Sequence, residues 1–258
     1  MMPKMSWPVT FCLLCYNEER ILAKYFEHVR PLTREIVVVD SGSTDGSVET
    51  ALRHADIVVS NPLDDFSAQR NLAASKATNR WVMHLDADEI LTPELIRALG
   101  ELFKTGRIGE YAACCFPRKT FDEEGRFRKI VQSYPGFHYR LYDRERCRWV
   151  KPVHETLQVD GPKKFIPHHM LHYPDYSRVP AKVALYDGLK KQMTDDHNRS
   201  TVGTMAGNLL FHARALFIDL DMWKNPGDFM YACRWLGHHA HIRVRRRLDT
   251  ARTALTRP

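Results

Sequence analysis

The chain has 258 residues, of which 44% are hydrophobic, and its formal net charge is +7. This composition excludes an intrinsically disordered chain and fits one large α/β domain, with or without a short helical appendage. No segment reaches the roughly 18 consecutive apolar residues that a membrane span needs. Residues 1–8 lack the apolar core of a signal peptide, so we expect a cytoplasmic protein that is soluble or peripheral to the membrane.

Short apolar runs alternate with helical patterns through the first hundred residues. Buried strands are predicted at Val9–Cys15, Glu35–Val39, Trp81–Leu85 and, shorter, at 56–59. Apolar residues recur at helical spacing over 18–29, 47–54, 66–76 and 93–103. This alternation predicts a mainly parallel sheet covered by helices on both faces. Cys12 and Cys15 lie inside the first apolar run, and we expect both to line the core as free thiols.

The second half of the chain is less regular. Residues 111–118 and 137–142 predict two further strands, 121–129 a hairpin loop, and 150–180 mostly loop. Apolar residues follow the helical period over 202–223, and a basic stretch follows at 238–247. We therefore divide the chain into an α/β domain over 1–200 and a helical, basic extension over 201–258. The extension is expected either to pack on the domain or to rest on an anionic membrane surface.

Two aspartates spaced by one residue follow the third predicted strand, in the run HLDADE. If the chain stays extended there, Asp86 and Asp88 point the same way. Paired carboxylates suit a hard cation such as Mg²⁺ or Mn²⁺, which bridges them to a diphosphate. The competing interpretation is a solvated acidic turn before the helix at 93–103. The position after an apolar strand in an α/β series favours the metal site, because ligands bind at strand ends in such sheets.

Polar residues also follow the first and second predicted strands. Asp40 closes a strand and leads into the turn SGSTDGS, where Ser41 and the glycines allow a nucleotide to approach the backbone. Tyr16 is suited to stacking on a base, and Glu18 to bonding a ribose, with Asn17 between them. The alternative for both stretches is ordinary turn chemistry, with Asn17 as a helix cap.

An arginine lies on the predicted helix at 66–76, in the run QRN. If Arg70 faces the strand ends, it can pair with a phosphate or orient the carboxylates of Asp86 and Asp88. If it faces solvent, it has no functional meaning. The sequence leaves the two possibilities equal.

Together these stretches resemble the family-2 glycosyltransferases of GT-A fold. The matching runs are VTFCLLCYNEE, EIVVVDSGSTDGS, DFSAQRNLAASKA and WVMHLDADE, which cover residues 9 to about 95. The later runs PGFHYRLYDR and VHETL resemble the lipopolysaccharide-core branch of the family, which acts at the cytoplasmic face of the inner membrane. The resemblance implies a Rossmann-like, mixed and mainly parallel sheet with flanking helices. It also implies an enzyme that uses a nucleotide-sugar, with a UDP-sugar as the expected donor.

The resemblance assigns roles to several residues. Asp40 would contact the base, Asp86 the ribose or the metal, and Asp88 the metal. The family's usual Glu-Asp pair is absent, and His154-Glu155 stands in its place, so Glu155 is the candidate general base of an inverting transfer. A histidine after the base region completes the metal shell in related enzymes, and His172 is the best placed here. The alternatives are a loop salt bridge for Glu155 and a structural role for the histidine.

Other functions remain to be weighed. A nucleotidyltransferase making an activated sugar needs a Gly-rich basic loop after the first strand, whereas this chain has the acidic run CYNEER. A protein that binds nucleotides or anionic surfaces with a vestigial enzyme core would explain the basic tail, but it would not need the acidic set described above. A Gln-x-x-Arg-Trp motif is absent, which argues against a processive synthase. We expect transfer to a saccharide or lipid-linked acceptor in cell-envelope glycan synthesis, and no binding of nucleic acid.

Overall fold

The structure is a computed structural model that describes residues 6–63, 65–127, 136–152 and 155–178. Its strands are β1 (Trp7–Cys15), β2 (Thr33–Asp40), β3 (Ile57–Ser60), β4 (Trp81–His84), β5 (Glu89–Leu91), β6 (Ala113–Thr120), β7 (Gly136–Asp143), β8 (Cys147–Val150), β9 (Thr156–Val159), β10 (Lys163–Phe165) and β11 (Met170–His172). Its α-helices are α1 (Glu19–Val29), α2 (Ser47–His54), α3 (Phe66–Lys76) and α4 (Pro93–Lys104). Two short 3₁₀ turns are η1 (Arg107–Glu110) and η2 (Tyr176–Arg178).

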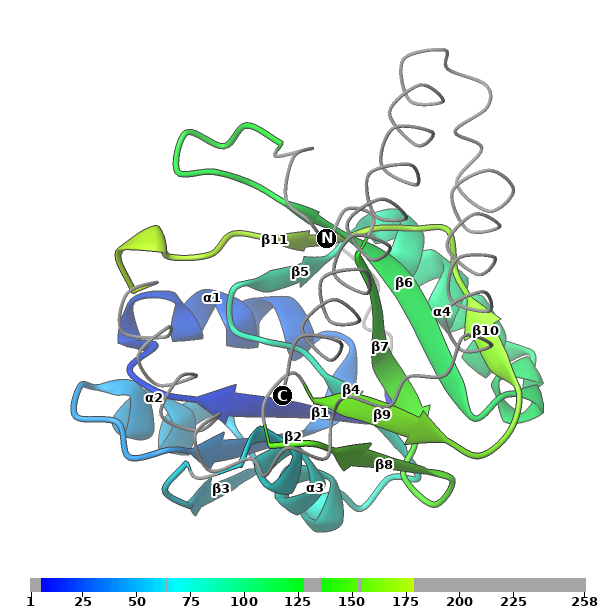
Figure 1. Cartoon of the computed structure of the whole chain (residues 1–258), viewed down its shortest axis with the longest axis horizontal. Coiled ribbons are helices and arrows are strands. Elements are labelled where there is room, and N and C mark those ends of the chain that lie inside the picture. The colour runs from blue at the N-terminus through cyan, green and yellow to red at the C-terminus, as the bar shows by residue number, and fades with distance from the viewer. Residues whose placement is uncertain (1–5, 64, 128–135, 153–154, 179–258) are drawn as a thin grey trace, which may run out of the picture. The chain divides into compact units, whose positions relative to one another are not determined.

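A single mixed sheet forms the centre of the described residues (Figure 1). The strand order is β3-β2-β1-β4-β7-β6-β11-β5, and β10 also pairs with β6. Strands β3, β2, β1 and β4 are parallel, whereas β7 is antiparallel to both β4 and β6. Strand β11 runs parallel to β6 and antiparallel to β5. The predicted α/β class with a mixed, mainly parallel sheet is therefore confirmed for the described part of the chain.

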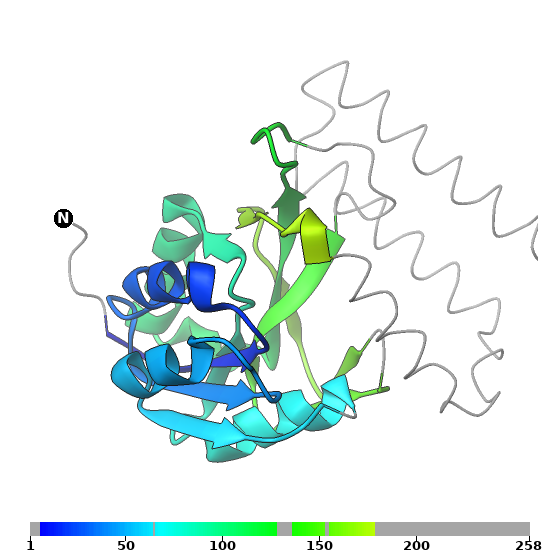
Figure 2. The same cartoon turned by 90° about the vertical axis from the view of Figure 1, so that its left-hand side faces the viewer.

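Alternate residues of the central strands face two separate cores. Phe11 and Leu13 of β1 pack in the core that contains the buried residues of α1, α2 and α4. Cys12 faces the other core, where α3 meets Trp149 and Leu157 of the β8–β9 ribbon. Figure 2 shows α1 and α2 on one side of the β1–β2 strands and α3 on the other. The predicted layering of helices on both faces is correct.

Some of the helices begin with a side-chain cap, and others do not. Thr92 caps α4, because its side chain accepts the Leu95 N–H and Pro93 occupies the first turn. Asp65 caps α3 by accepting the Ala68 N–H at 3.0 Å. The predicted capping of α1 by Asn17 is wrong, since α1 starts after Glu18 without a side-chain cap. Cys12 and Cys15 are buried free thiols in β1, as expected, and burial raises the pKa of Cys15 to about 12.

The described part of 150–180 is mostly outside strands, as predicted, but the prediction missed three short strands. Three short strands, β9, β10 and β11, lie in this stretch and pair with β8, β6 and β5. Each has only three or four residues, so none shows a clear pattern in the sequence. The proposed extension over 201–258 lies outside the described residues. None of the described helices is long and apolar enough to cross a membrane.

Candidate active site

Three parallel neighbours, β2, β1 and β4, bring their carboxyl ends to one edge of the sheet. Cys15 at the end of β1 is in register with Asp40 at the end of β2. Cys12 of β1 is in register with His84 at the end of β4, just before the Asp86 turn. The segments after these strands carry most of the residues that the sequence singled out, so the fold gathers them at one edge.

Asp40 shapes the loop that follows β2. Its carboxylate is 3% exposed, and Oδ2 accepts hydrogen bonds from the Gly42 and Ser43 N–H groups, each at 3.0 Å. Gly42 has a φ of +92°, which a residue with a Cβ rarely adopts. The Ser41 N–H donates to the Cys15 carbonyl at 2.8 Å, which ties the loop to β1. The structure thus gives Asp40 and Ser41 a role in forming this loop.

The residues after β1 brace this same loop. Asn17 has a φ of +55°, and its side-chain oxygen accepts the Thr44 N–H at 2.7 Å. The Asn17 N–H donates to the Ser43 hydroxyl at 2.9 Å, and the Glu18 N–H to the Ser47 hydroxyl at 2.7 Å. Tyr16 is 47% exposed beside them. The two loops are therefore held together, with an exposed aromatic ring at their edge.

The turn after β4 is closed rather than extended. The Glu89 N–H donates to the Asp86 carbonyl at 3.0 Å, and the Asp86 N–H donates to Oε2 of Glu89 at 3.1 Å. The carboxylates of Asp86 and Asp88 consequently have different partners, and the extended arrangement predicted from the sequence is wrong. Asp86 contacts Arg140 at 2.6 Å and Arg70 at 3.5 Å. Burial alone would raise the pKa of Asp86, but these two guanidinium groups outweigh it and hold the pKa well below its usual range.

Asp88 faces a histidine from a distant segment. Its Oδ2 lies 3.3 Å from Nε2 of His172 at the end of β11, and both side chains are mostly buried. Nδ1 of His172 lies 3.1 Å from the Thr120 hydroxyl, which fixes the ring orientation. The Tyr173 N–H donates to the Asp88 carbonyl at 2.9 Å, so β11 and the turn are joined beside this pair. The structure therefore brings together Asp88 and His172, two of the three predicted metal ligands.

Glu155 pairs with Arg70, which is 85 residues away in the chain. Its Oε1 accepts from Nε of Arg70 at 3.0 Å and lies 2.9 Å from an Nη of the same group. The Arg70 side chain is only 6% exposed and lies 5.0 Å from the centre of the Trp149 ring. The described salt bridge of Glu155 is therefore with helix α3, and not with its own loop as the alternative interpretation expected. His154 lies outside the described residues.

Asn71, the next residue on α3, binds strand β8, which precedes Glu155 in the β8–β9 ribbon. Its side-chain nitrogen donates to the Trp149 carbonyl at 2.9 Å, and its oxygen accepts the Trp149 N–H at 3.0 Å. Arg70 thus faces the strand ends, as one of the two interpretations required. Because the same guanidinium contacts Asp86 and Glu155, residues from β4, α3 and the ribbon meet at one point.

His84 lies fully buried at the end of β4, beneath this group. Its ring stacks on Tyr142 with centroids 5.9 Å apart and meets Trp149 edge-on. Burial lowers the pKa of His84 well below its ordinary value, and the nearby charges of Arg70 and Arg140 lower it further. A neutral imidazole at this position does not compete with the two arginines for the surrounding carboxylates.

Three residues that the sequence did not link to the two aspartates complete the ion-pair network. Glu89 is buried and contacts Arg118 at 3.1 Å and also Arg140. The glutamate lies directly after the predicted metal ligands, which was its only signal. Arg118 and Arg140 lie in predicted strands, and nothing local shows that both side chains point toward the Asp86 turn.

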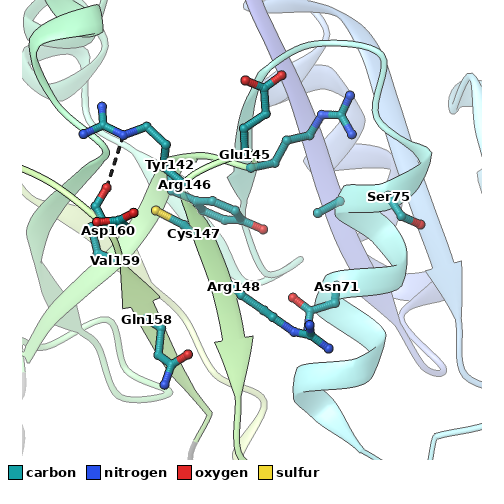
Figure 3. Close-up of a pocket in the computed structure, with 12 residues that line it drawn as sticks. Asn71, Ser75, Tyr142, Glu145, Arg146, Cys147, Arg148, Gln158, Val159 and Asp160 are labelled. Carbon is teal, nitrogen blue, oxygen red and sulfur yellow. Dashed lines mark hydrogen bonds between the residues drawn. The ribbon is translucent and has the colours of Figure 1, made fainter.

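A separate cavity of about 820 Å³ lies beside the β8–β9 ribbon (Figure 3). Asn71 and Ser75 of α3, Tyr142, and the β8–β9 residues Arg148 and Gln158 are among its lining residues. It contains none of the predicted site residues. The candidate site is therefore defined by the converging side chains at the strand ends, not by this cavity.

The side chains of Asp88 and His172 offer two donor atoms for a divalent cation. Within residues 6–178, excluding the undescribed gaps, no three His, Cys, Asp or Glu side chains form a cluster that could hold a metal ion. Two donors are nevertheless adjacent. Adjacent ligand atoms in an octahedral shell with bonds of about 2.1 Å lie about 3 Å apart, close to the 3.3 Å between Asp88 and His172. Thr120 on the other ring nitrogen is the outer partner that a metal-binding histidine usually has. The two atoms are therefore spaced as two donors to one cation would be, and the described residues offer no third such donor beside them.

A comparison with known families agrees with this geometry. The model of the family described as "Glycosyl transferase family 2" matches residues 10–159, more than half of the chain. The chain belongs to glycosyl transferase family 2. The match covers every described element from β2 to β9 and most of β1, and it confirms the family-2 assignment made from the motifs. It does not favour the nucleotidyltransferase or the vestigial binding protein.

Curated relatives resemble part of the chain. The lipopolysaccharide core biosynthesis glycosyltransferase LpsC of Rhizobium meliloti is 34% identical over 107 residues, which is 40% of this chain and 38% of LpsC. An uncharacterised glycosyltransferase of Rickettsia typhi is 33% identical over 101 residues, covering 39% of this chain and 35% of the relative. The match thus spans little more than a third of the length of these relatives. Their substrates and partners are therefore not assigned to this chain.

Solved structures give a weaker likeness. Mannosyl-3-phosphoglycerate synthase from Rubrobacter xylanophilus has a TM-score of 0.47 at 15% identity, covering 76% of this chain and 77% of that one. Glucosyl-3-phosphoglycerate synthase from Mycobacterium tuberculosis, in complex with Mg²⁺ and uridine diphosphate, has a TM-score of 0.46 at 19% identity, covering 74% and 81%. Values this low carry no argument about the site.

Proposed function

We propose that this chain is an inverting glycosyltransferase that moves a sugar from a nucleotide-sugar donor to a hydroxyl of a saccharide or lipid-linked acceptor. The observation that carries the proposal is the shared Arg70 guanidinium, which binds both Asp86 of the predicted metal motif and Glu155, the candidate base. A reaction of this class needs a site for a diphosphate leaving group and a base for the acceptor close together. The membership in family 2 supports the same chemistry.

The donor nucleoside is proposed to lie over the loops after β1 and β2. Tyr16 is exposed and suited to stacking on the base, and Asn17 and Glu18 shape its surroundings. Asp40 and Ser41 line the adjoining loop, whose backbone Gly42 leaves open. We propose UDP as the nucleotide, as the resemblance to family-2 glycosyltransferases implies.

The diphosphate is proposed to lie beside Asp88 and His172. A divalent cation, Mg²⁺ or Mn²⁺, would neutralise charge that develops on the departing diphosphate when it is bound there. Asp88 and His172 would hold that cation, while Thr120 orients the imidazole. Asp86 is bound to two arginines, so we assign it to orienting those groups and the ribose, and only secondarily to the metal.

Glu155 is proposed to accept the proton of the acceptor hydroxyl. Arg70 binds its Oε1 through two nitrogens and fixes the plane of the carboxylate. An oxygen that already accepts two charged hydrogen bonds is a poor proton acceptor, so we assign the proton transfer to Oε2. The acceptor oxygen would then attack the sugar carbon on the face opposite the diphosphate.

A donor screen tests the proposal directly. The full chain is mixed with UDP-, GDP-, ADP- and dTDP-sugars, with and without Mn²⁺, and its melting temperature is measured. A nucleotide-sugar that binds should raise the melting temperature in a concentration-dependent manner, and more with Mn²⁺ present. Slow hydrolysis of the same donor, measured as free nucleoside diphosphate, should accompany binding. No shift and no hydrolysis with any donor would contradict the proposal.

The acceptor and the location in the cell follow from weaker signals. We propose a cell-envelope glycan as the product, in line with LpsC among the relatives. The basic residues 201–258, which lie outside the described part of the chain, are proposed to hold the enzyme at the inner face of the cytoplasmic membrane. Co-sedimentation with vesicles containing anionic lipid tests this second point.

A further inference from the structure

Glu89 is a carboxylate that neither the motif nor the proposed reaction uses, and its side chain is fully buried. It follows Asp88 and opens β5. A buried carboxylate is costly unless other groups pair with it and satisfy its oxygens, and losing one partner of such a pair is strongly destabilising. Its partners therefore show what the burial accomplishes.

Three different elements supply those partners. Oε1 lies 3.1 Å from Nη1 of Arg118 on β6 and also contacts Nη2 of Arg140 on β7. Oε2 accepts the Asp86 N–H at 3.1 Å. One carboxylate thus joins β5, β6 and β7 to the turn that carries the aspartate pair.

The contacts act on both aspartates. The Asp86 N–H bond to Glu89 and the return bond from the Glu89 N–H to the Asp86 carbonyl close the turn in both directions. Arg140 donates to Glu89 and Asp86 from the same Nη2 atom, so the position of one carboxylate sets that of the other. Glu89 is also in register with His172 on β11, which faces Asp88.

We propose that Glu89 is a positioning residue that fixes the Asp86–Asp88 turn, and with it the spacing between Asp88 and His172. It does not touch the substrate. Without its charge, Arg118 and Arg140 lose a shared partner, and Arg140 is drawn fully to Asp86. The turn then loosens, because one of its two reciprocal hydrogen bonds, from the Asp86 N–H, ends on this carboxylate. This inference rests on the proposed cation and diphosphate site.

The test uses Glu89→Gln, which keeps the shape and one acceptor oxygen but removes the charge. Glu94→Gln is the matched control, since Glu94 is 53% exposed and pairs with Arg97 on its own helix. Binding of UDP to the full chain is measured by calorimetry with and without Mn²⁺, with ADP, GDP or dTDP in its place if one of these raises the melting temperature more. We expect Glu89→Gln to weaken binding at least tenfold with Mn²⁺ and less than twofold without it. Glu94→Gln should leave both values unchanged.

A second variant separates positioning from general stability. Arg118→Met combined with Glu89→Gln removes one positive charge together with the negative one, and should recover part of any lost melting temperature. We expect the tenfold loss of Mn²⁺-dependent binding to remain, because the turn still lacks its carboxylate. Full recovery of binding along with the melting temperature would show a merely structural role and overturn the proposal. So would unchanged Mn²⁺-dependent binding in Glu89→Gln, whereas a wild-type chain that binds no nucleotide would instead defeat the proposed function.

Discussion

Replacing Arg70 by lysine separates the charge of this residue from its geometry. The guanidinium makes two close contacts with Oε1 of Glu155, at 3.0 and 2.9 Å, and a longer one of 3.5 Å with Asp86. Lysine keeps the charge but reaches only one of these carboxylates at a time. Hydrogen bonds to charged groups contribute about 1.5–3 kcal/mol each, so we expect Arg70→Lys to cost about 2 kcal/mol of unfolding free energy.

A loss of that size lowers the melting temperature by about 4–8 °C in a domain of this size. We expect turnover to fall at least tenfold, because Glu155 is no longer held in one orientation, and a tenfold loss corresponds to about 1.4 kcal/mol in the barrier. Melting temperature and steady-state transfer or donor hydrolysis are measured side by side. Arg97→Lys is the control, since Arg97 is 69% exposed and pairs with Glu94 on its own helix. Turnover of Arg70→Lys within twofold of wild type would refute the reasoning.

Four further outcomes are expected. Asp88→Ala should abolish transfer and the Mn²⁺ effect on nucleotide binding while leaving the circular dichroism spectrum unchanged; unaltered turnover with metal present would contradict its role. Glu155→Gln should depress kcat far more than donor KM, and equal losses in both would point to a structural residue. Burial lowers the pKa of His28 and that of His138, so the unfolded chain binds protons more readily. Above about pH 6.5 both histidines are neutral in the folded and the unfolded chain, and the free energy of unfolding does not depend on them. Below that pH the free energy of unfolding decreases, by at most about 1.4 kcal/mol per histidine and pH unit, because only the unfolded chain takes up the protons. An equal melting temperature at pH 7.5 and 5.5 would exclude this. Deleting residues 201–258 should release the protein from anionic vesicles, and continued co-sedimentation would refute membrane binding by that segment.

The sequence predicted the strands that consist of one continuous apolar run. The apolar runs that became β1, β2 and β4 face buried surfaces on both sides, so their pattern was unmistakable. Strand β11 was missed because it has three residues and is stabilised by pairing with β6, about fifty residues earlier. A strand this short has no period to read, and its existence depends on its neighbours.

The same distinction applies to the candidate site. Asp40, Asp86 and Asp88 were found because each follows a recognisable strand. The Arg70–Glu155 pair, 85 residues apart, was not predicted as a contact, because only the folded sheet brings α3 to the ribbon. The extended Asp86–Asp88 arrangement was wrong for a related reason. Glu89 closes the turn with a side chain whose burial depends on Arg118 and Arg140 from other strands.

The β8–β9 ribbon is a sheet of its own, separate from the nine-stranded one. Asn71 on α3 is hydrogen-bonded to its first strand, and Arg70 on the same helix pairs with Glu155, the residue just before its second strand. The strand ends that would bind the donor and the ribbon that would carry the base are therefore joined through two adjacent side chains, Arg70 and Asn71. A chimaera that exchanges residues 147–159 for those of a relative while retaining this two-residue fastening should keep its donor and change its acceptor. Such an exchange must also keep Trp149 and Leu157, because both are buried in the core beneath α3.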